Sequence, residues 1–249
     1  MTLRSDAAED RVAAWADDGG WPLESPAWRD AIGAEFGKPY MVALRERLRR
    51  SARAGAKITP PLDRVMLPLE LTDPSEIRAV ILAQDPYPRE GRATGLAFAI
   101  ASSDVIPQSL ANIFEELLPE APPSPDLVTW ANQGVLLINT IWTTEATKRL
   151  WHKEWGWETF TRFVLERVRD LAPPSAILLW GRPAREYAPL FTGSRHKVFE
   201  ASHPARISRK ISFMGSRPFE EANEFLRGPP DRRIDWSMRH KLDADPSLR

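Results

Sequence analysis

Polar residues or glycine follow four short apolar runs of this chain. The four endings are Gln84-Asp85, Asn139, Gly181 and Ser202-His203. A carboxylate can offset a developing positive charge, an amide can read the edge of a planar ligand, and an imidazole can donate to a developing oxyanion. An acid, an amide and an imidazole brought to one cleft would therefore make a candidate active site.

The apolar runs that precede these residues predict the elements that position them. They cover residues 79–82, 135–138, 176–180 and 198–201. Continuous apolar runs of this length are typical of strands buried on both faces, as in parallel sheets. Helical patterns lie between and after them, at residues 109–118, 157–171 and 218–226. We expect an α/β fold with a central four-stranded, mainly parallel sheet flanked by helices on both faces. Ligands of such sheets bind at the carboxyl ends of the strands, where the four endings would meet.

The same reading predicts one domain from residue 28 to residue 236. Residues 1–27 are expected to be a polar, loosely packed lead-in, and residues 237–249 a polar tail. Ser25-Pro26 is placed to cap a helix that starts near Trp28, because proline is favoured in the first turn. A second helix is expected from Tyr40 to Arg53, after the interruption at Gly37 and Pro39.

Composition narrows the class of protein. The chain has 249 residues, of which 43% are hydrophobic and 27% charged, and it has no cysteine. The absence of cysteine excludes disulfides and thiolate metal sites, and the four histidines form no HxH or HxxxH pair. No apolar run approaches the roughly 20 residues needed to span a bilayer, and the N-terminus lacks an apolar export segment. We expect a cytoplasmic (intracellular) monomer with no metal and no cofactor.

Charge is balanced overall but unevenly distributed. There are 34 basic and 34 acidic residues, and a net charge of zero argues against a nucleic-acid partner. However, residues 195–217 contain six Lys or Arg and one acid, and residues 45–57 contain six against Glu46. Each basic run is either a solvated face or a surface that contacts phosphate.

Three longer motifs resemble one enzyme family. Residues 79–100, AVILAQDPYPREGRATGLAFAI, resemble the water-activating motif GQDPYH and the following GLxFS segment of family 1 uracil-DNA glycosylases. Residues 130–139, WANQGVLLIN, resemble the family's WAxQGVLLLN, and residues 203–208, HPARIS, stand where the family has HPSPLS. Shorter matches occur in the family's order at 35–40, 152–157, 178–181 and 234–236. The resemblance extends from about Trp28 to Trp236.

This resemblance implies an activity and two catalytic residues. A member would flip uracil out of DNA and hydrolyse its N-glycosidic bond, leaving free uracil and an abasic site. Its partner would be uracil-containing DNA. Asp85 would position the attacking water and offset the positive charge on the sugar. His203 would donate a hydrogen bond to uracil O2 as the anion forms.

The resemblance also implies four residues that bind the base. Asn139 would accept a hydrogen bond from uracil N3–H and donate to O4, a pattern that cytosine reverses. Phe98 would stack on the flipped base. Tyr87 would sit against C5 and exclude the methyl group of thymine, and Gln84 would contribute further contacts to the base.

DNA contacts are expected from the loops. The candidates are Pro107, Ser109, Gly181, Arg182, Ser202, Arg206, Ile207, Ser208, Arg209 and Lys210. By resemblance, Ser109 touches a phosphate, and Ile207 takes the place of the leucine that fills the hole left by the flipped base. The neighbouring basic residues would contact phosphates. A proteinaceous glycosylase inhibitor is a further candidate partner.

Several motif positions depart from the family pattern. Pro88 replaces a histidine and Ala83 a glycine in the first motif, and Ala99 replaces a serine. Other departures are Arg182 for serine, Ala205-Arg206 for Ser-Pro and Ile207 for leucine. Pro88 has the largest consequence, because it removes an imidazole that helps to order the active-site water and also removes one N–H.

Three alternatives stay open at this stage. One is a glycosylase of the same superfamily that acts on another damaged base, which Tyr87 and Asn139 disfavour. Another is a protein that flips and holds uracil without cutting, which the retention of both Asp85 and His203 disfavours. The third is a small-molecule α/β enzyme, disfavoured by the basic loops and by the lack of a glycine-rich phosphate motif.

Overall fold

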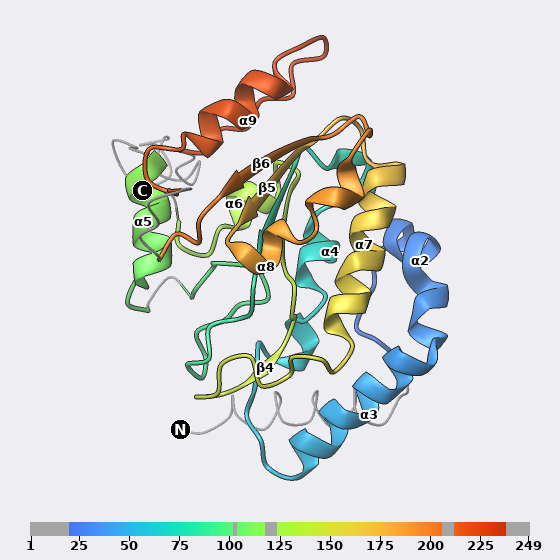
Figure 1. Cartoon of the computed structure of the whole chain (residues 1–249). Helices are drawn as coiled ribbons and strands as arrows, with labels where there is room; N and C mark the ends of the chain where they lie inside the picture. The colour runs from blue at the N-terminus through green and yellow to red at the C-terminus, as the bar shows by residue number, and fades with distance from the viewer. Residues whose placement is uncertain (1–19, 102–103, 118–123, 206–211, 238–249) are drawn as a thin grey trace, which may run out of the picture.

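The central sheet confirms the predicted α/β fold. The computed structural model describes residues 20–101, 104–117, 124–205 and 212–237. Its main sheet contains β2 (Ala79–Ala83), β3 (Val135–Asn139), β5 (Ala176–Trp180) and β6 (Lys197–Ala201), in the order β3-β2-β5-β6 (Figure 1). Every pairing in this sheet is parallel. The carboxyl ends of the four strands therefore lie along one edge.

Alternate residues of the strands face two separate cores. Val80 and Leu82 of β2 pack into one core, while Ala79 and Ile81 pack into the other. All five positions of β2, β3 and β5 are buried, as continuous apolar runs predict. At the edge of the sheet, β6 instead exposes Lys197 and Glu200.

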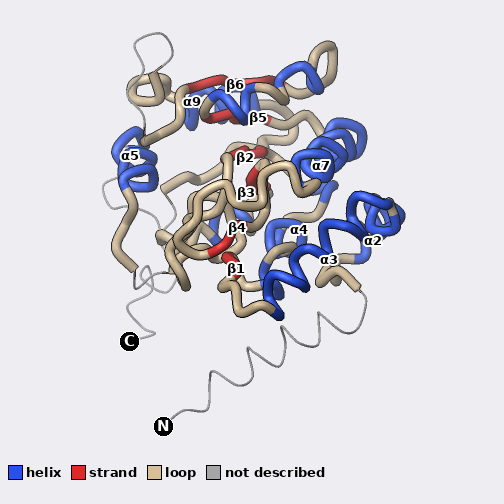
Figure 2. Tube along the Cα trace, turned by 60° about the horizontal axis from the view of Figure 1, so that its bottom comes forward, coloured by secondary structure: helices blue, strands red, loops and turns tan. Residues whose placement is uncertain are grey.

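Helices cover both faces of the sheet (Figure 2). The first core includes residues of α2 (Pro26–Ile32), α3 (Pro39–Arg53), α4 (Leu67–Leu71), α7 (Trp157–Leu171) and α8 (Arg182–Arg185). The second includes residues of α5 (Gln108–Leu117), α6 (Val128–Ala131) and α9 (Pro218–Leu226). Helices α7 and α9 coincide with the predicted ranges, and the ends of α3 and α5 lie within one residue of theirs.

Several short elements were not expected from the sequence. They are β1 (Ile58–Thr59), β4 (Thr144–Glu145), the short helices α4, α6 and α8, and the 3-10 helices η1 (Gly33–Gly37), η2 (Leu62–Arg64), η3 (Pro74–Glu76) and η4 (Ala188–Phe191). Elements of two to five residues are too short to show a hydrophobic period. The pair β1 and β4 is antiparallel and joins segments that are distant in the chain, with Ile58 opposite Glu145.

The packed domain begins earlier than the predicted boundary at Trp28. Trp21 and Leu23 are both buried in the first core, and the Ser25 hydroxyl accepts a hydrogen bond from the Trp28 amide at 3.4 Å. The described part of residues 1–27 is therefore packed against the domain rather than loose. Near the other predicted boundary, Trp236 is buried and Ser237 is exposed. Residues 1–19 and 238–249 lie outside the described part of the chain.

Neither a membrane-spanning helix nor a metal-binding cluster occurs among the described residues. Within these ranges, no helix has the length and apolar character to cross a membrane. The same ranges contain no group of three or more His, Asp or Glu side chains arranged to hold a metal ion.

We expect the buried His152 to make folding stability depend on pH. Burial lowers the pKa of His152 to about 4, an effect that Glu145 partly offsets. The unfolded chain, with an ordinary histidine pKa near 6.5, binds a proton more readily than the folded chain between these values. The free energy of unfolding should therefore fall as pH drops from about 6.5 toward 4, by at most about 1.4 kcal/mol per pH unit.

Urea unfolding of the wild type and of His152→Gln across this pH range measures the effect. The variant should show a shallower decline, with a residual slope from His196, whose pKa burial also lowers. A constant difference in unfolding free energy between the two proteins from pH 4 to pH 7 would contradict the prediction.

Candidate active site

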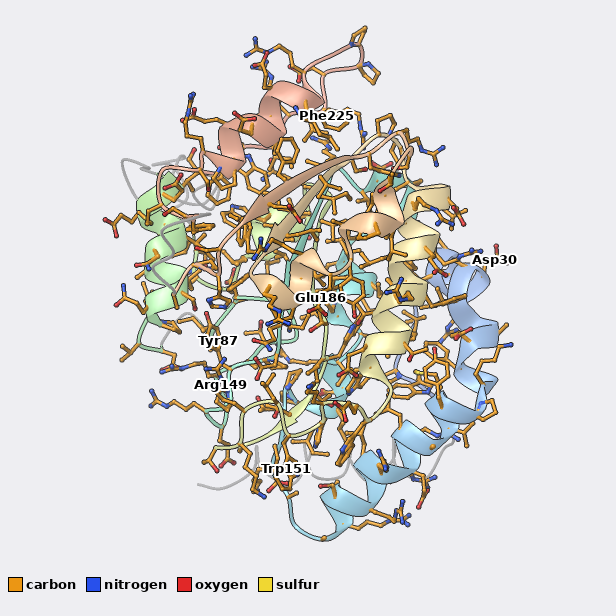
Figure 3. All side chains as sticks on the ribbon, in the orientation of Figure 1. Asp30, Tyr87, Arg149, Trp151, Glu186 and Phe225 are labelled. Atoms are coloured by element: carbon orange, nitrogen blue, oxygen red, sulfur yellow. The ribbon has the colours of Figure 1, made fainter. Side chains whose placement is uncertain are left out.

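A cavity of about 250 Å³ lies at the carboxyl edge of the sheet. Six residues nominated from the sequence as catalytic or base-binding line it: Gln84, Asp85, Tyr87, Phe98, Asn139 and His203. Pro107, just before α5, and Ser109, in its first turn, line it as well, together with Arg149. Two of the lining residues, Tyr87 and Arg149, are labelled in Figure 3 and lie close together there.

The turn after β2 is tied directly to the end of β3. The Ala83 carbonyl accepts a hydrogen bond from the Thr140 amide at 2.9 Å. The Gln84 carbonyl accepts from the Ile141 amide at 3.0 Å and from the Thr140 hydroxyl at 2.8 Å. These bonds hold the backbone of the turn in a constant relation to Asn139, the last residue of β3.

Asp85 is a buried carboxylate with two partners from a distant loop. Its side chain is only 4% exposed, and the Arg149 guanidinium lies 3.7 Å from Oδ1. The Leu150 amide donates to Oδ2 at 3.1 Å. Burial raises the pKa of Asp85, while the Leu150 amide and the Arg149 charge act in the opposite direction. A carboxyl group whose pKa is shifted by both burial and a neighbouring charge is typical of a catalytic acid or base.

The backbone after β6 determines which nitrogen of His203 carries the proton. The Ala205 amide donates to His203 Nδ1 at 3.1 Å, so Nδ1 is an acceptor and the neutral ring carries its proton on Nε2. Asn112 of α5 holds the same loop, because its side-chain amide donates to the Pro204 carbonyl at 2.6 Å. The arrangement leaves Nε2–H as the donor of a partly buried imidazole that lines the cavity.

Gly181 contacts the loop that carries His203. Its φ of +100° lies in the region that favours glycine, and an added Cβ would come 3.1 Å from the His203 Cβ. A larger residue at this position would therefore strain the backbone and push on the imidazole. The sequence nominated Gly181 as a DNA contact, and the structure gives it this additional constraint.

Asn139 presents a buried acceptor to the cavity. The side chain belongs to a residue that is 6% exposed, and its Oδ1 has no hydrogen-bond partner among the described residues. The backbone of Asn139 is held from behind, where the Thr161 hydroxyl contacts its carbonyl at 3.2 Å. Buried acceptors are rarely left unsatisfied, and Asn139 is the one described residue with such an atom that also lines the cavity. Its Oδ1 is therefore placed to accept from a ligand that supplies a donor.

Phe98 and Tyr87, the two aromatic residues that line the cavity, are each held in place. Phe98 is 7% exposed and adopts a φ of +64°, a conformation that costs a non-glycine residue of order 1–3 kcal/mol and is found mainly at functional sites. Its ring lies 5.8 Å from the His203 ring. The Tyr87 hydroxyl lies 2.8 Å from the Ser109 hydroxyl, and burial raises its pKa to about 12, so the phenol is neutral at working pH.

Only some of the residues expected to contact DNA lie in the part of the chain that the structure describes. Ser109 and Ser202 are buried, and Ser109 contacts Tyr87 directly. Arg182 is 88% exposed at the start of α8, 3.7 Å from Glu186. Arg206, Ile207, Ser208, Arg209 and Lys210 lie outside the described residues.

Sequence reasoning missed two residues that shape the site. Arg149 follows the two-residue strand β4 rather than a long apolar run, so nothing in the pattern placed it near Asp85. Asn112 lies on the polar side of a helix that was predicted, but its partner, Pro204, is 92 residues away. The one local signal for Arg149 is its place within the basic, aromatic segment 148–153.

Comparisons with known proteins identify the family of this chain. The family model described as the uracil DNA glycosylase superfamily matches residues 69–227, which is more than half of the chain. The chain belongs to this superfamily. The matched range of this superfamily member includes Asp85, Asn139 and His203.

Curated relatives and solved structures extend the assignment. The uracil-DNA glycosylase of Enterococcus faecalis is 38% identical over 216 residues, covering 85% of this chain and 95% of the relative. That of a Geobacillus strain is 40% identical over 215 residues, covering 85% and 96%. The crystal structure of mimivirus uracil-DNA glycosylase superposes with a TM-score of 0.83 at 24% identity, covering 91% of this chain and 92% of that one, and shows the fold.

Proposed function

We propose that this superfamily member excises uracil from DNA by hydrolysing the N-glycosidic bond, with Asp85 and His203 as its catalytic residues. The family assignment supports the reaction, and the curated relatives are named for it. The main support for the residue roles is the position of Asn139. Its buried, unsatisfied Oδ1 belongs to a residue that lines the same cavity as the Asp85 carboxylate and the His203 imidazole.

The Asn139 side chain supports uracil as the base. Uracil offers a donor at N3 and an acceptor at O4, which match the side-chain oxygen and the side-chain NH₂ of an asparagine. Cytosine offers an acceptor at N3, which would face the buried Oδ1 and leave it unsatisfied. A site that leaves a buried polar atom unpaired rejects the wrong ligand strongly, so we assign Asn139 the discrimination against cytosine.

The catalytic roles follow from where charge develops. As the bond to the base breaks, positive charge builds on the deoxyribose, and Asp85 offsets it while orienting the water that attacks C1′. Negative charge builds on uracil O2, and the Nε2–H of His203 donates to it. Phe98 stacks on the flipped base, and Gln84 contributes contacts from the turn.

The remaining assignments concern the DNA and other partners. We assign Pro107, Ser109, Gly181, Arg182, Ser202 and residues 206–210 to the surface that contacts DNA. A protein inhibitor is a second candidate partner, and a mimivirus variant 25% identical to this chain is known in complex with UGI. We also propose that the protein acts as a monomer, inside the cell where its substrate is found.

An oligonucleotide assay tests the proposal. The protein is incubated with a strand that contains one uracil, then treated with alkali, which breaks the strand at an abasic site. We expect cleavage at the former uracil and none in matched strands that carry cytosine or thymine. Retained binding without an abasic site would instead identify a uracil-binding protein, and cleavage only at another damaged base would identify a different glycosylase.

We expect Tyr87→Ala to relax the rejection of thymine. The tyrosine hydroxyl is held by Ser109, so its ring forms a rigid wall of the cavity, and removing it opens room for a methyl group. Tyr87→Phe is the matched control, because it keeps the wall and loses only the hydroxyl. Release of thymine from a T-containing strand by the alanine variant alone is the expected result. Equal rejection of thymine by both variants would mean that another group guards C5.

A further inference from the structure

The loop after β4 is docked onto the turn that carries Asp85. The Thr147 amide donates to the Pro88 carbonyl at 2.6 Å, and the Leu150 amide donates to Asp85 Oδ2 at 3.1 Å. The partners in the second bond are 65 residues apart in the chain. The loop therefore holds both the end of the turn and the catalytic carboxylate.

Two residues of this loop have left-handed backbone conformations, which surrounding contacts hold in place. Thr147 has a φ of +68° and Leu150 a φ of +55°, although neither is a glycine. Residues in this region cost free energy and persist only where surrounding contacts hold them. Those contacts include the pairing of β4 with β1 and the Lys148 amide, which donates to the Glu145 carbonyl at 2.9 Å.

This loop places the Arg149 guanidinium 3.7 Å from Asp85 Oδ1. Leu150 and Arg149 thus contact the two oxygens of one carboxylate, one with a neutral amide and the other with a full charge. The Arg149 side chain is 61% exposed and lines the cavity, whereas the carboxylate is almost fully buried. The guanidinium approaches the buried acid from the solvent side.

We propose that Arg149 is a positioning residue for Asp85: together with the Leu150 amide it fixes the orientation of the carboxylate, and its charge favours the ionised form. This inference rests on the proposed function and deepens it. Pro88 gives the turn no side-chain donor of its own, and Arg149 brings a cation to the Asp85 carboxylate from a different loop. The other ionisable groups that line the cavity are Tyr87, on the same turn, and His203, after β6.

The test compares Arg149→Gln, Arg149→Lys and the wild type in the uracil-release assay from pH 5 to pH 8.5. Loss of the cation should lower kcat about tenfold at neutral pH, with little change in KM. The ratio of wild-type to Arg149→Gln activity should grow as pH falls, because Asp85 without its cation is protonated more easily. Arg149→Lys should restore much of the rate and of the wild-type pH profile.

Lys153→Gln provides a matched control. Lys153 follows the same loop and is exposed, but it pairs with Glu154 and does not line the cavity. This variant should keep the wild-type rate and pH profile. Thermal melting of all four proteins checks that each is folded.

Two outcomes overturn the inference. One is an Arg149→Gln pH profile that parallels the wild-type profile. The other is a loss confined to KM, with a lower slope of KM against salt, which would make Arg149 a phosphate contact instead. Both require an active wild type, so they are distinct from a failure of the proposed function, in which the wild type itself forms no abasic site.

Discussion

Asp85→Asn is expected to lower kcat about a thousandfold and to leave the fold at least as stable as the wild type. The rate falls because a neutral amide cannot offset the positive charge on the sugar, and preorganised charge is usually the largest single contribution to catalysis. KM should change little, since Asp85 acts on the transition state more than on the bound base.

The stability expectation follows from the direction of the pKa shift. Burial raises the pKa of Asp85, which means that ionisation is more costly in the folded chain than in the unfolded chain. Above the pKa of Asp85 in the folded chain, the wild type carries a buried charge that lowers its free energy of unfolding. The neutral amide of Asp85→Asn avoids this cost. Any advantage of Asp85→Asn should disappear at low pH, where the wild-type carboxyl is protonated.

Single-turnover kinetics and urea unfolding at pH 7 and pH 3.5 measure both effects. Asp85→Ala is the matched control, because it removes the acceptor for the Leu150 amide as well as the charge. It should be as slow as Asp85→Asn but less stable. A rate within tenfold of the wild type for Asp85→Asn would show that this carboxylate does not carry the chemistry.

His203→Ala is expected to lower kcat by about 100- to 1000-fold, the loss typical of one oxyanion donor. The physical reason is the tautomer. Because the Ala205 amide occupies Nδ1, the neutral ring offers its only proton from Nε2. Alanine removes that donor while leaving Phe98, Tyr87 and Asn139 in place, so binding of uracil-containing DNA should be largely retained.

A second variant separates the donor from the loop that carries it. Asn112→Ala removes the bond to the Pro204 carbonyl but keeps the imidazole, so it should lose about tenfold or less. Rates of uracil release at saturating DNA give the comparison directly. Equal losses in the two variants would mean that loop position, rather than the imidazole, limits the reaction.

The local pattern of the sequence determined the architecture of the sheet. Residues such as Val80, Leu136 and Ile177 lie in short continuous apolar runs, which are typical of strands covered on both faces. Parallel pairing then brings the ends of those runs to one edge, so Asp85, Asn139 and His203 could be assigned to one cleft. The motifs around them identified the family.

Only the tertiary structure decided how those residues are held. The approach of Arg149 to Asp85 depends on a pair of two-residue strands and on the left-handed φ of Thr147 and Leu150. Such short strands have no hydrophobic period, and neither residue type favours that backbone region. These contacts form between segments far apart in the chain, so the turn from Gln84 to Pro88 could be read from the sequence, whereas the loop that docks on it could not.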